Sequence, residues 1–208
     1  MVAEIRHYKD SCKGFEEILY NSVSNKLASF KGFTDSLKKN EKSVIENFPL
    51  LIFIVDSLQA DCVITISKIT EGERGQKTIQ KFLNFVSANS KELNKEYPKL
   101  EQETIIKQES LIKSIEPQIL RIRTQRDKYF AHSDNKYFLE PKQLQIDFPK
   151  TYDDLTDILS ALQSIISTHS MIISGSARAD MSGFVYANTF RTIEMLEKAN
   201  KLSNNELE

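Results

Sequence analysis

"LEQETIIKQESLIKSIEPQILRIRTQRDKYFA", residues 100–131, is the longest stretch of the chain with one helical pattern. Two apolar series run through it at seven-residue steps: Ile105, Ile112 and Ile119, and alongside them Gln108, Ile115, Ile122 and Tyr129. Such a stripe is suited to packing lengthwise against another helix. Pro117 lies within the stretch, so we expect a kink or the start of a second helix there.

Apolar residues at steps of three and four predict further helices on both sides of this stretch. They cover roughly residues 10–38, 50–69, 77–89, 152–173 and 187–202. Six Gly and five Pro leave few residues for the many tight turns of an all-β protein. The prediction is one all-α domain over residues 1–208, a bundle of about five to seven helices with a long kinked helix that carries the motif described below.

Charge and cysteine content limit the classes of protein. The chain has 28 Lys and Arg against 29 Asp and Glu, so nucleic-acid binding would depend on a local patch. Cys12 and Cys62 lack the spacing of metal ligands, and residues 1–14 lack the apolar core of a signal peptide. These features favour a cytoplasmic protein.

The most apolar run, residues 48–69, has the length of a membrane span but contains Asp56, Gln59 and Asp61. Each of these side chains would be costly at the centre of a bilayer. We therefore interpret the run as a core helix and expect no membrane association.

A permanent cation interrupts the apolar stripe. Arg126 stands one seven-residue step after Ile119, so it should lie in or beside a helix interface, where an unpaired charge is expensive. His132 lies about 120° further round an ideal helix. The two side chains would meet if the last turn unwinds, or if a second copy contributes its own pair across a two-fold axis.

The segment 121–128, "RIRTQRDK", has a net charge of plus three in a chain that is otherwise nearly neutral. This cationic strip fits phosphate binding. Two structural readings remain open: cations are favoured at a helix C-terminus, and Arg126 can be half of a buried ion pair.

"RDKYFAH", residues 126–132, resembles the motif of the HEPN (higher eukaryotes and prokaryotes nucleotide-binding) superfamily, in which an arginine, a polar residue and four residues of any kind precede a histidine. The longer "RTQRDKYFAHSD", residues 123–134, is similar to the abortive-infection branch, which acts in bacterial defence against phage. The resemblance implies an α-helical, usually homodimeric endoribonuclease that needs no metal or other cofactor. Arg126 and His132 take the two motif roles, and Asp127 takes the polar position.

These residue types suit RNA cleavage independently of the resemblance. RNA carries its own nucleophile, the 2′-hydroxyl, so the protein needs a group that exchanges protons near neutral pH and a cation for the charged phosphorane. Asp127 is expected to orient Arg126 or His132. The predicted substrate-binding residues are Arg121, Arg123, Lys128 and Tyr129, although we favour packing for Tyr129.

Other histidines are weaker candidates. His169 has apolar neighbours and is expected in the core, and His7 is expected in a mobile N-terminal region; nothing in the sequence predicts a zinc site.

The predicted function is that of a cytoplasmic, homodimeric HEPN endoribonuclease, active in phage defence or as the toxin of a toxin–antitoxin pair, with RNA as substrate and, for a toxin, an antitoxin protein as partner. We expect the dimer to use the stripe Ile112, Ile115, Ile119 and Ile122, unless that stripe forms the monomer's own core. Two alternatives remain: a non-catalytic module that binds nucleotide, RNA or protein through the cationic strip, and a purely structural interaction protein. Among these three, the ribonuclease alone requires His132.

Overall fold

The computed structural model describes residues 3–39, 48–71, 77–131, 140, 143, 146–147 and 152–205, with the backbone alone at 129–131, 204 and 205. The regular elements of these residues are all helices, so the predicted all-α fold is confirmed. Contacts group the chain into two compact units, Met1–Val23 with Val63–Ala179 and Ser24–Cys62 with Asp180–Glu208. That the chain functions as one domain stays a prediction.

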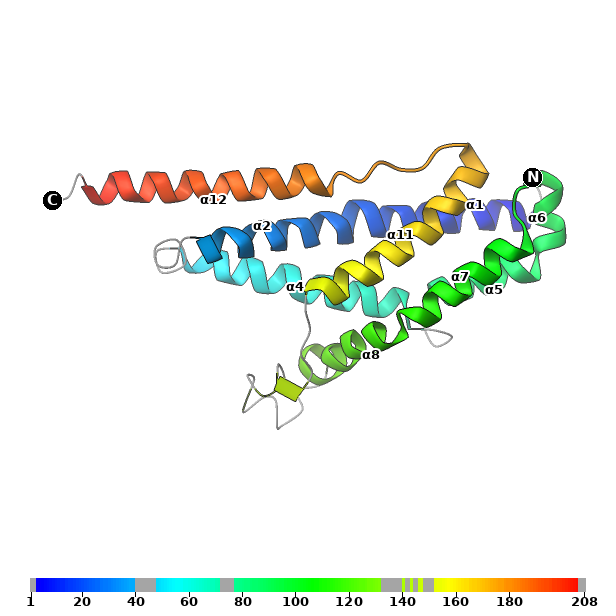
Figure 1. Ribbon diagram of the computed structural model, residues 1–208, viewed down its shortest axis with the longest axis horizontal. Coiled ribbons are helices and arrows are strands. Elements are labelled where there is room, and N and C mark those ends of the chain that lie inside the picture. Colours follow the sequence, from blue (N-terminus) through cyan, green and yellow to red (C-terminus); the bar gives the residue numbers. More distant parts are fainter. Residues whose placement is uncertain are drawn as a thin grey trace. The chain divides into compact units, whose positions relative to one another are not determined.

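The first unit contains the motif. Its elements are α1 (Ala3–Glu16), most of the π-helix η1 (Glu17–Ser24), the end of α4 (Pro49–Ile69), α5 (Ile79–Ala88), α6 (Ser90–Glu96), α7 (Gln102–Ser114), α8 (Glu116–Gln125), the π-helix η2 (Arg126–Ala131) and α11 (Tyr152–Ser174). Helix α11 packs against α1 and α8, and α5 packs against α7 (Figure 1). The core consists of fully buried side chains from these helices, among them Tyr8, Leu83, Ile105, Ile122, Ile158 and Leu162.

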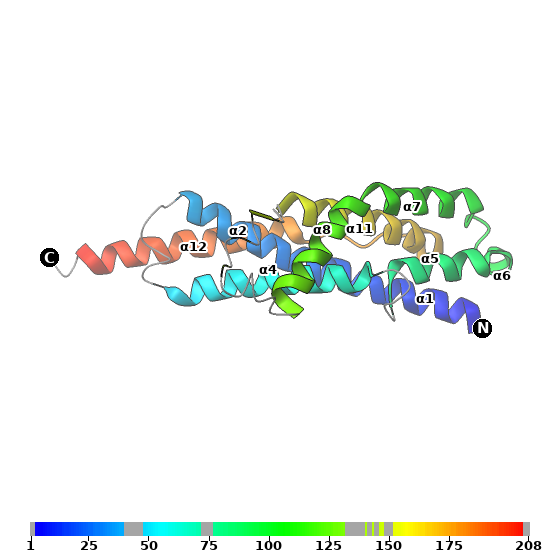
Figure 2. The same cartoon turned by 90° about the horizontal axis from the view of Figure 1, so that it is seen from below.

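The stretch 100–131 forms three successive helical segments rather than one helix. The chain leaves helical geometry at Ile115, and α8 then begins at Glu116 with Pro117 in its first turn. A proline is tolerated there because the first amides of a helix have no intrahelical acceptor. Figure 2 shows the change of direction between α7 and α8. The predicted break at Pro117 is confirmed as the start of a second helix.

The apolar stripe of this stretch belongs to the core of the first unit. Ile115, Ile119 and Ile122 are 7%, 5% and 0% exposed, and α8 packs on α11. Three of the four residues named for a dimer seam are therefore part of the chain's own core, which is the alternative left open above, while Ile112 is half-buried and the dimer itself stays a prediction. Periodicity identifies an apolar face but does not say which helix covers it, and here α11 of the same chain does so.

The second unit contains α2 (Asn25–Lys39), the first two thirds of α4 and α12 (Ser182–Asn205). Helices α2 and α12 lie side by side (Figure 1). An apolar cluster joins the three helices: Phe33, Phe48, Leu51, Ile54, Ile193 and Leu196. Lys26 pairs with Asp61 at 2.6 Å, and Lys39 pairs with Glu194 at 2.8 Å.

Helix α4 is long and apolar enough to cross a membrane, the only such helix within the described ranges. Its most apolar window has a mean hydropathy of 1.8, and 28% of that window is buried. A single helix of this kind is weak support for a membrane span, because core helices pass the same test. The core interpretation holds for Leu51, Cys62 and Ile66, which are buried, but not for Leu50 and Phe53, which are 66% and 70% exposed.

Two helix boundaries differ from the sequence-based expectation. The first helix begins at Ala3, so His7 lies within α1 and not in an irregular N-terminal segment. The last helix begins at Ser182, five residues before the expected start. Ile5 and Tyr8 continue the steps of three and four made by Cys12 and Phe15, so the periodic pattern extends to the start of α1, whereas the consecutive apolar residues 184–186 show no such spacing.

Candidate functional site

Arg126 is the first residue of η2, the π-helical turn that continues α8. π-Helical turns are rare, and they occur frequently at functional sites. The side chain of Arg126 is 17% exposed, which confirms that this cation lies at the edge of a helix interface.

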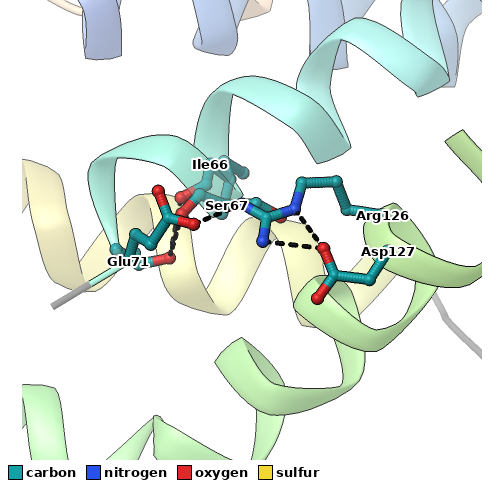
Figure 3. A network of polar contacts seen from close by, with 6 residues as sticks. Ile66, Ser67, Glu71, Arg126 and Asp127 are labelled. Carbon is teal, nitrogen blue, oxygen red and sulfur yellow. Dashed lines mark hydrogen bonds and ion pairs between the residues drawn. The ribbon is translucent and has the colours of Figure 1, made fainter. Parts of the chain in front are cut away.

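Two carboxylates hold the Arg126 guanidinium (Figure 3). Nη1 donates to Glu71 Oε1 at 3.1 Å, while Nε and Nη2 each lie 2.7 Å from Asp127 Oδ1. The bond to Asp127 is the main cause that raises the pKa of Arg126 above its ordinary value; partial burial acts in the opposite direction. The guanidinium is thus a fixed cation whose charge is balanced within the protein.

The end of α4 supplies the second of these carboxylates. Thr70 Oγ1 donates to the carbonyl oxygens of Ile66 at 2.7 Å and Ser67 at 3.3 Å, which closes the last turn of the helix (Figure 3). Thr70 is 5% exposed, and Ile66 and Ser67 are fully buried. Glu71 is the next residue after this turn, and its side chain is 33% exposed.

Arg123 lies near the same charges. Burial lowers the pKa of its guanidinium, Arg126 lowers it further, and Glu71 acts in the opposite direction. Nε of Arg123 is buried without a hydrogen-bond partner among the residues that the structure describes. Two guanidinium groups and two carboxylates therefore form one electrostatic group at the start of η2.

Arg121 points to a different partner. Its Nε and Nη2 donate to the two carboxylate oxygens of Asp154 at 2.9 and 2.5 Å. Asp154 stands in the first turn of α11, where a carboxylate is favoured, and its side chain is 10% exposed. This bidentate pair ties α8 to α11. The predicted role of Arg121 in phosphate binding stays a prediction.

The remaining motif residues are described in part. Lys128 is exposed on η2. Tyr129 is in η2 with its side chain outside the description, and His132 lies outside the described residues. The predicted meeting of His132 with Arg126, within one chain or across a dimer axis, therefore stays a prediction.

His169 is a core residue, as expected. It is fully buried, with Nδ1 2.7 Å from the Tyr8 hydroxyl and Nε2 3.0 Å from Gln108 Oε1. Burial lowers its pKa from 6.5 to about 4, so the ring is neutral at physiological pH. Across the described ranges, no three His, Cys, Asp or Glu side chains are placed to bind one metal ion together.

Sequence reasoning found Arg126 and Asp127 but missed Glu71. Glu71 lies 55 residues before Arg126, next to the glycine-containing segment between α4 and α5, and belongs to no motif. Only the meeting of the end of α4 with η2 places it at the site. No signal in a single sequence identifies that contact.

An all-α chain in which an arginine–histidine motif follows a long helical stretch is of the HEPN class. The family model for AbiU2, a HEPN family, matches residues 10–192, and the chain belongs to this family. The resemblance inferred from the motif is thereby confirmed, including its abortive-infection branch. Membership points to a role of the ribonuclease or abortive-infection kind. No curated protein and no solved structure matches the chain.

Proposed function

We propose that the protein is a metal-independent endoribonuclease that acts in abortive infection or as the toxin of a toxin–antitoxin pair. The observation that carries this proposal is the fixed guanidinium of Arg126, held by Glu71 and Asp127 at the first position of the motif. A preorganised cation is the group that a charged phosphorane requires. The proposed enzyme is a cytoplasmic homodimer whose substrate is RNA.

In the proposed mechanism the 2′-hydroxyl of RNA attacks the adjacent phosphorus, and the 5′-oxygen of the next nucleotide leaves. His132 takes part in one of the two proton transfers, because an imidazole exchanges protons near neutral pH. Arg126 stabilises the negative charge on the non-bridging oxygens. The contacts to Glu71 and Asp127 engage three of the five N–H groups of its guanidinium, so Nη1 and Nη2 each retain one N–H for a phosphate oxygen.

The geometry gives less support to the alternative, a module that binds phosphates along the cationic strip without cutting. The segment 121–128 has four cations and one carboxylate, a net charge of plus three. Asp154 pairs with Arg121 and Glu71 pairs with Arg126, which lowers the net charge of the whole group to plus one. A broad phosphate-binding surface needs cations that remain available to the ligand. Catalysis by one oriented guanidinium and one imidazole needs no such excess.

The test is cleavage of RNA by purified protein in excess chelator, with wild type beside Arg126→Ala and His132→Ala. Arg178→Ala is the matched control, because Arg178 is also paired with a glutamate, Glu17 at 2.6 Å, but lies outside the motif. We expect cleavage by wild type and by the control, and none by the two motif variants. RNA binding without cleavage by wild type, His132→Ala and the control, with weaker binding by Arg126→Ala, would support the binding module instead.

A further inference from the structure

We propose that Glu71 is a positioning residue for Arg126: its carboxylate sets the orientation in which the guanidinium meets the scissile phosphate. This inference rests on the proposed ribonuclease function and adds to it a residue that the HEPN motif does not contain. Three features of the described residues support it.

The first feature is the arrangement of the two carboxylates around the guanidinium. Asp127 is the sequence neighbour of Arg126 and binds the Nε and Nη2 side, whereas Glu71 follows the end of α4 by two residues and binds Nη1. With Asp127 alone, both the guanidinium and the group that holds it belong to the same turn, η2, and can move together. A second anchor outside η2, just after the end of α4, removes that freedom and fixes the plane of the group.

The second feature is the rigidity of the anchor. Glu71 directly follows Thr70, whose hydroxyl closes the last turn of α4, and the residues of that turn are buried. A carboxylate on a mobile loop would follow Arg126 in its motion. One attached to a packed helix end holds the guanidinium against the scaffold.

The third feature is the charge of Arg123. The Arg126 guanidinium disfavours the charged state of Arg123, and Glu71 favours the charged state of both. Without Glu71, Arg126 is expected to turn away from the partly buried Arg123 toward solvent. Glu71 thus determines where Arg126 rests, and the described contacts still leave N–H groups on Nη1 and Nη2 for substrate.

Kinetics of RNA cleavage test the proposal with Glu71→Ala, Glu71→Gln and, as matched control, Glu103→Ala. Glu103 is likewise a glutamate in one ion pair, with Lys107 at 2.7 Å, but it lies on α7 away from the motif. We expect Glu71→Ala to lower kcat by roughly 10- to 100-fold with KM nearly unchanged, as for an interaction used in the transition state. Glu71→Gln keeps an acceptor oxygen but loses the charge, so its kcat should lie between those of Glu71→Ala and wild type, and the control should match wild type.

Three results would overturn the inference. A lower KM with unchanged or higher kcat in Glu71→Ala would mean that Glu71 competes with the phosphate. An effect no larger than that of Glu103→Ala would mean that it does not act on Arg126. If Glu71→Ala fails to fold, Glu71→Asp replaces it. Aspartate keeps the negative charge, but its side chain is one methylene shorter, so the carboxylate no longer reaches Nη1 of Arg126. Full kcat in that variant would contradict a positioning role for Glu71.

Arg126→Ala in the same assay separates the two proposals. Cleavage that does not depend on Arg126 would contradict the proposed function. Cleavage that depends on Arg126 but not on Glu71 would contradict only the inference about Glu71. A readout without RNA is the Nη1–H signal of Arg126 in NMR spectra, because Nη1 donates to Glu71; it is assigned by its absence in Arg126→Lys. We expect slow exchange with solvent in wild type and in Glu103→Ala, and fast exchange in Glu71→Ala; slow exchange in Glu71→Ala would contradict the anchoring role.

Discussion

The hydroxyl of Tyr8 in α1 lies 2.7 Å from Nδ1 of His169 in α11, and both side chains are fully buried. Gln108 Oε1 in α7 accepts from the other ring nitrogen, Nε2, because an amide oxygen has no hydrogen to donate. The tautomer is thereby fixed: Nε2 carries the hydrogen, and the Tyr8 hydroxyl donates to Nδ1. A neutral His169 thus joins α1, α7 and α11, and protonation would break the bond from Tyr8.

Protonation of His169 should make the stability of the protein depend on pH. Its pKa is about 4 in the folded protein and near 6.5 when unfolded, so the unfolded chain binds the extra proton between these values. The free energy of unfolding should therefore fall by about 1.4 kcal/mol per pH unit as the pH drops from 6.5 to 4, or about 3 kcal/mol in all. Above pH 6.5 this contribution is fully present.

Urea denaturation at several pH values between 7 and 4 measures this dependence. His169→Gln should show a shallower slope, because the titrating group is absent, while His7→Gln, at an exposed position, should keep the wild-type slope. Equal slopes in the two variants would assign the pH dependence to other groups.

Gly32→Ala should destabilise the protein through the contact between α2 and α12. A Cβ at Gly32 would lie 3.0 Å from Thr189 Cβ and 3.1 Å from the carbonyl oxygen of Tyr186, so the two helices would have to separate. Overpacking of this kind costs about 1–3 kcal/mol. Gly14→Ala is the matched control: nothing lies within 4 Å of its Cβ, and alanine should stabilise the helix by about 0.5–1 kcal/mol. Thermal unfolding should shift in opposite directions, and shifts of the same sign would contradict the close approach.

The sequence predicted where the helices lie better than which helices pack against each other. Spacing of apolar residues located α4, α7, α8 and α11, because each buries one face. It also placed Arg126 at an interface and His169 in the core. It could not assign the stripe around Ile119 to α11 instead of a second copy, since either partner satisfies the same periodicity. The π-helical geometry of η2 and the contact of Glu71 with Arg126 depend on tertiary packing, and neither has a sequence signature.

The pair formed by Arg121 and Asp154 should contribute to stability. Asp154 is nearly buried but Arg121 is 40% exposed, so solvent screening reduces the interaction, and a double-mutant cycle with alanine should give a coupling free energy of about 1 kcal/mol. The exposed pair Glu103–Lys107 should give a smaller value by the same denaturation measurements. A coupling no larger than that of the exposed pair would show that the bidentate geometry adds nothing.

Overproduction of the wild-type protein should slow the growth of a bacterial host, because uncontrolled RNA cleavage halts translation. Arg126→Ala and His132→Ala should each restore growth at equal protein levels, with circular dichroism confirming the helical fold. Arg178→Ala should remain as toxic as wild type. Equal toxicity of all four proteins would argue against the ribonuclease.

The products of cleavage should identify the nucleophile. The motif offers an imidazole and a fixed guanidinium, groups that transfer a proton and stabilise an oxyanion, so the attacking oxygen is expected to come from the substrate itself. Cleavage in excess chelator should then leave a 2′,3′-cyclic phosphate and a 5′-hydroxyl, which mass spectrometry of a short oligonucleotide distinguishes from a 3′-hydroxyl and a 5′-phosphate. Replacing the 2′-hydroxyl by hydrogen at the mapped cut site should abolish cleavage there, whereas the same replacement two nucleotides away should leave it intact. Cleavage of the 2′-deoxy site, or products ending in a 5′-phosphate, would require an attacking water and would rule out the mechanism assigned to Arg126 and His132.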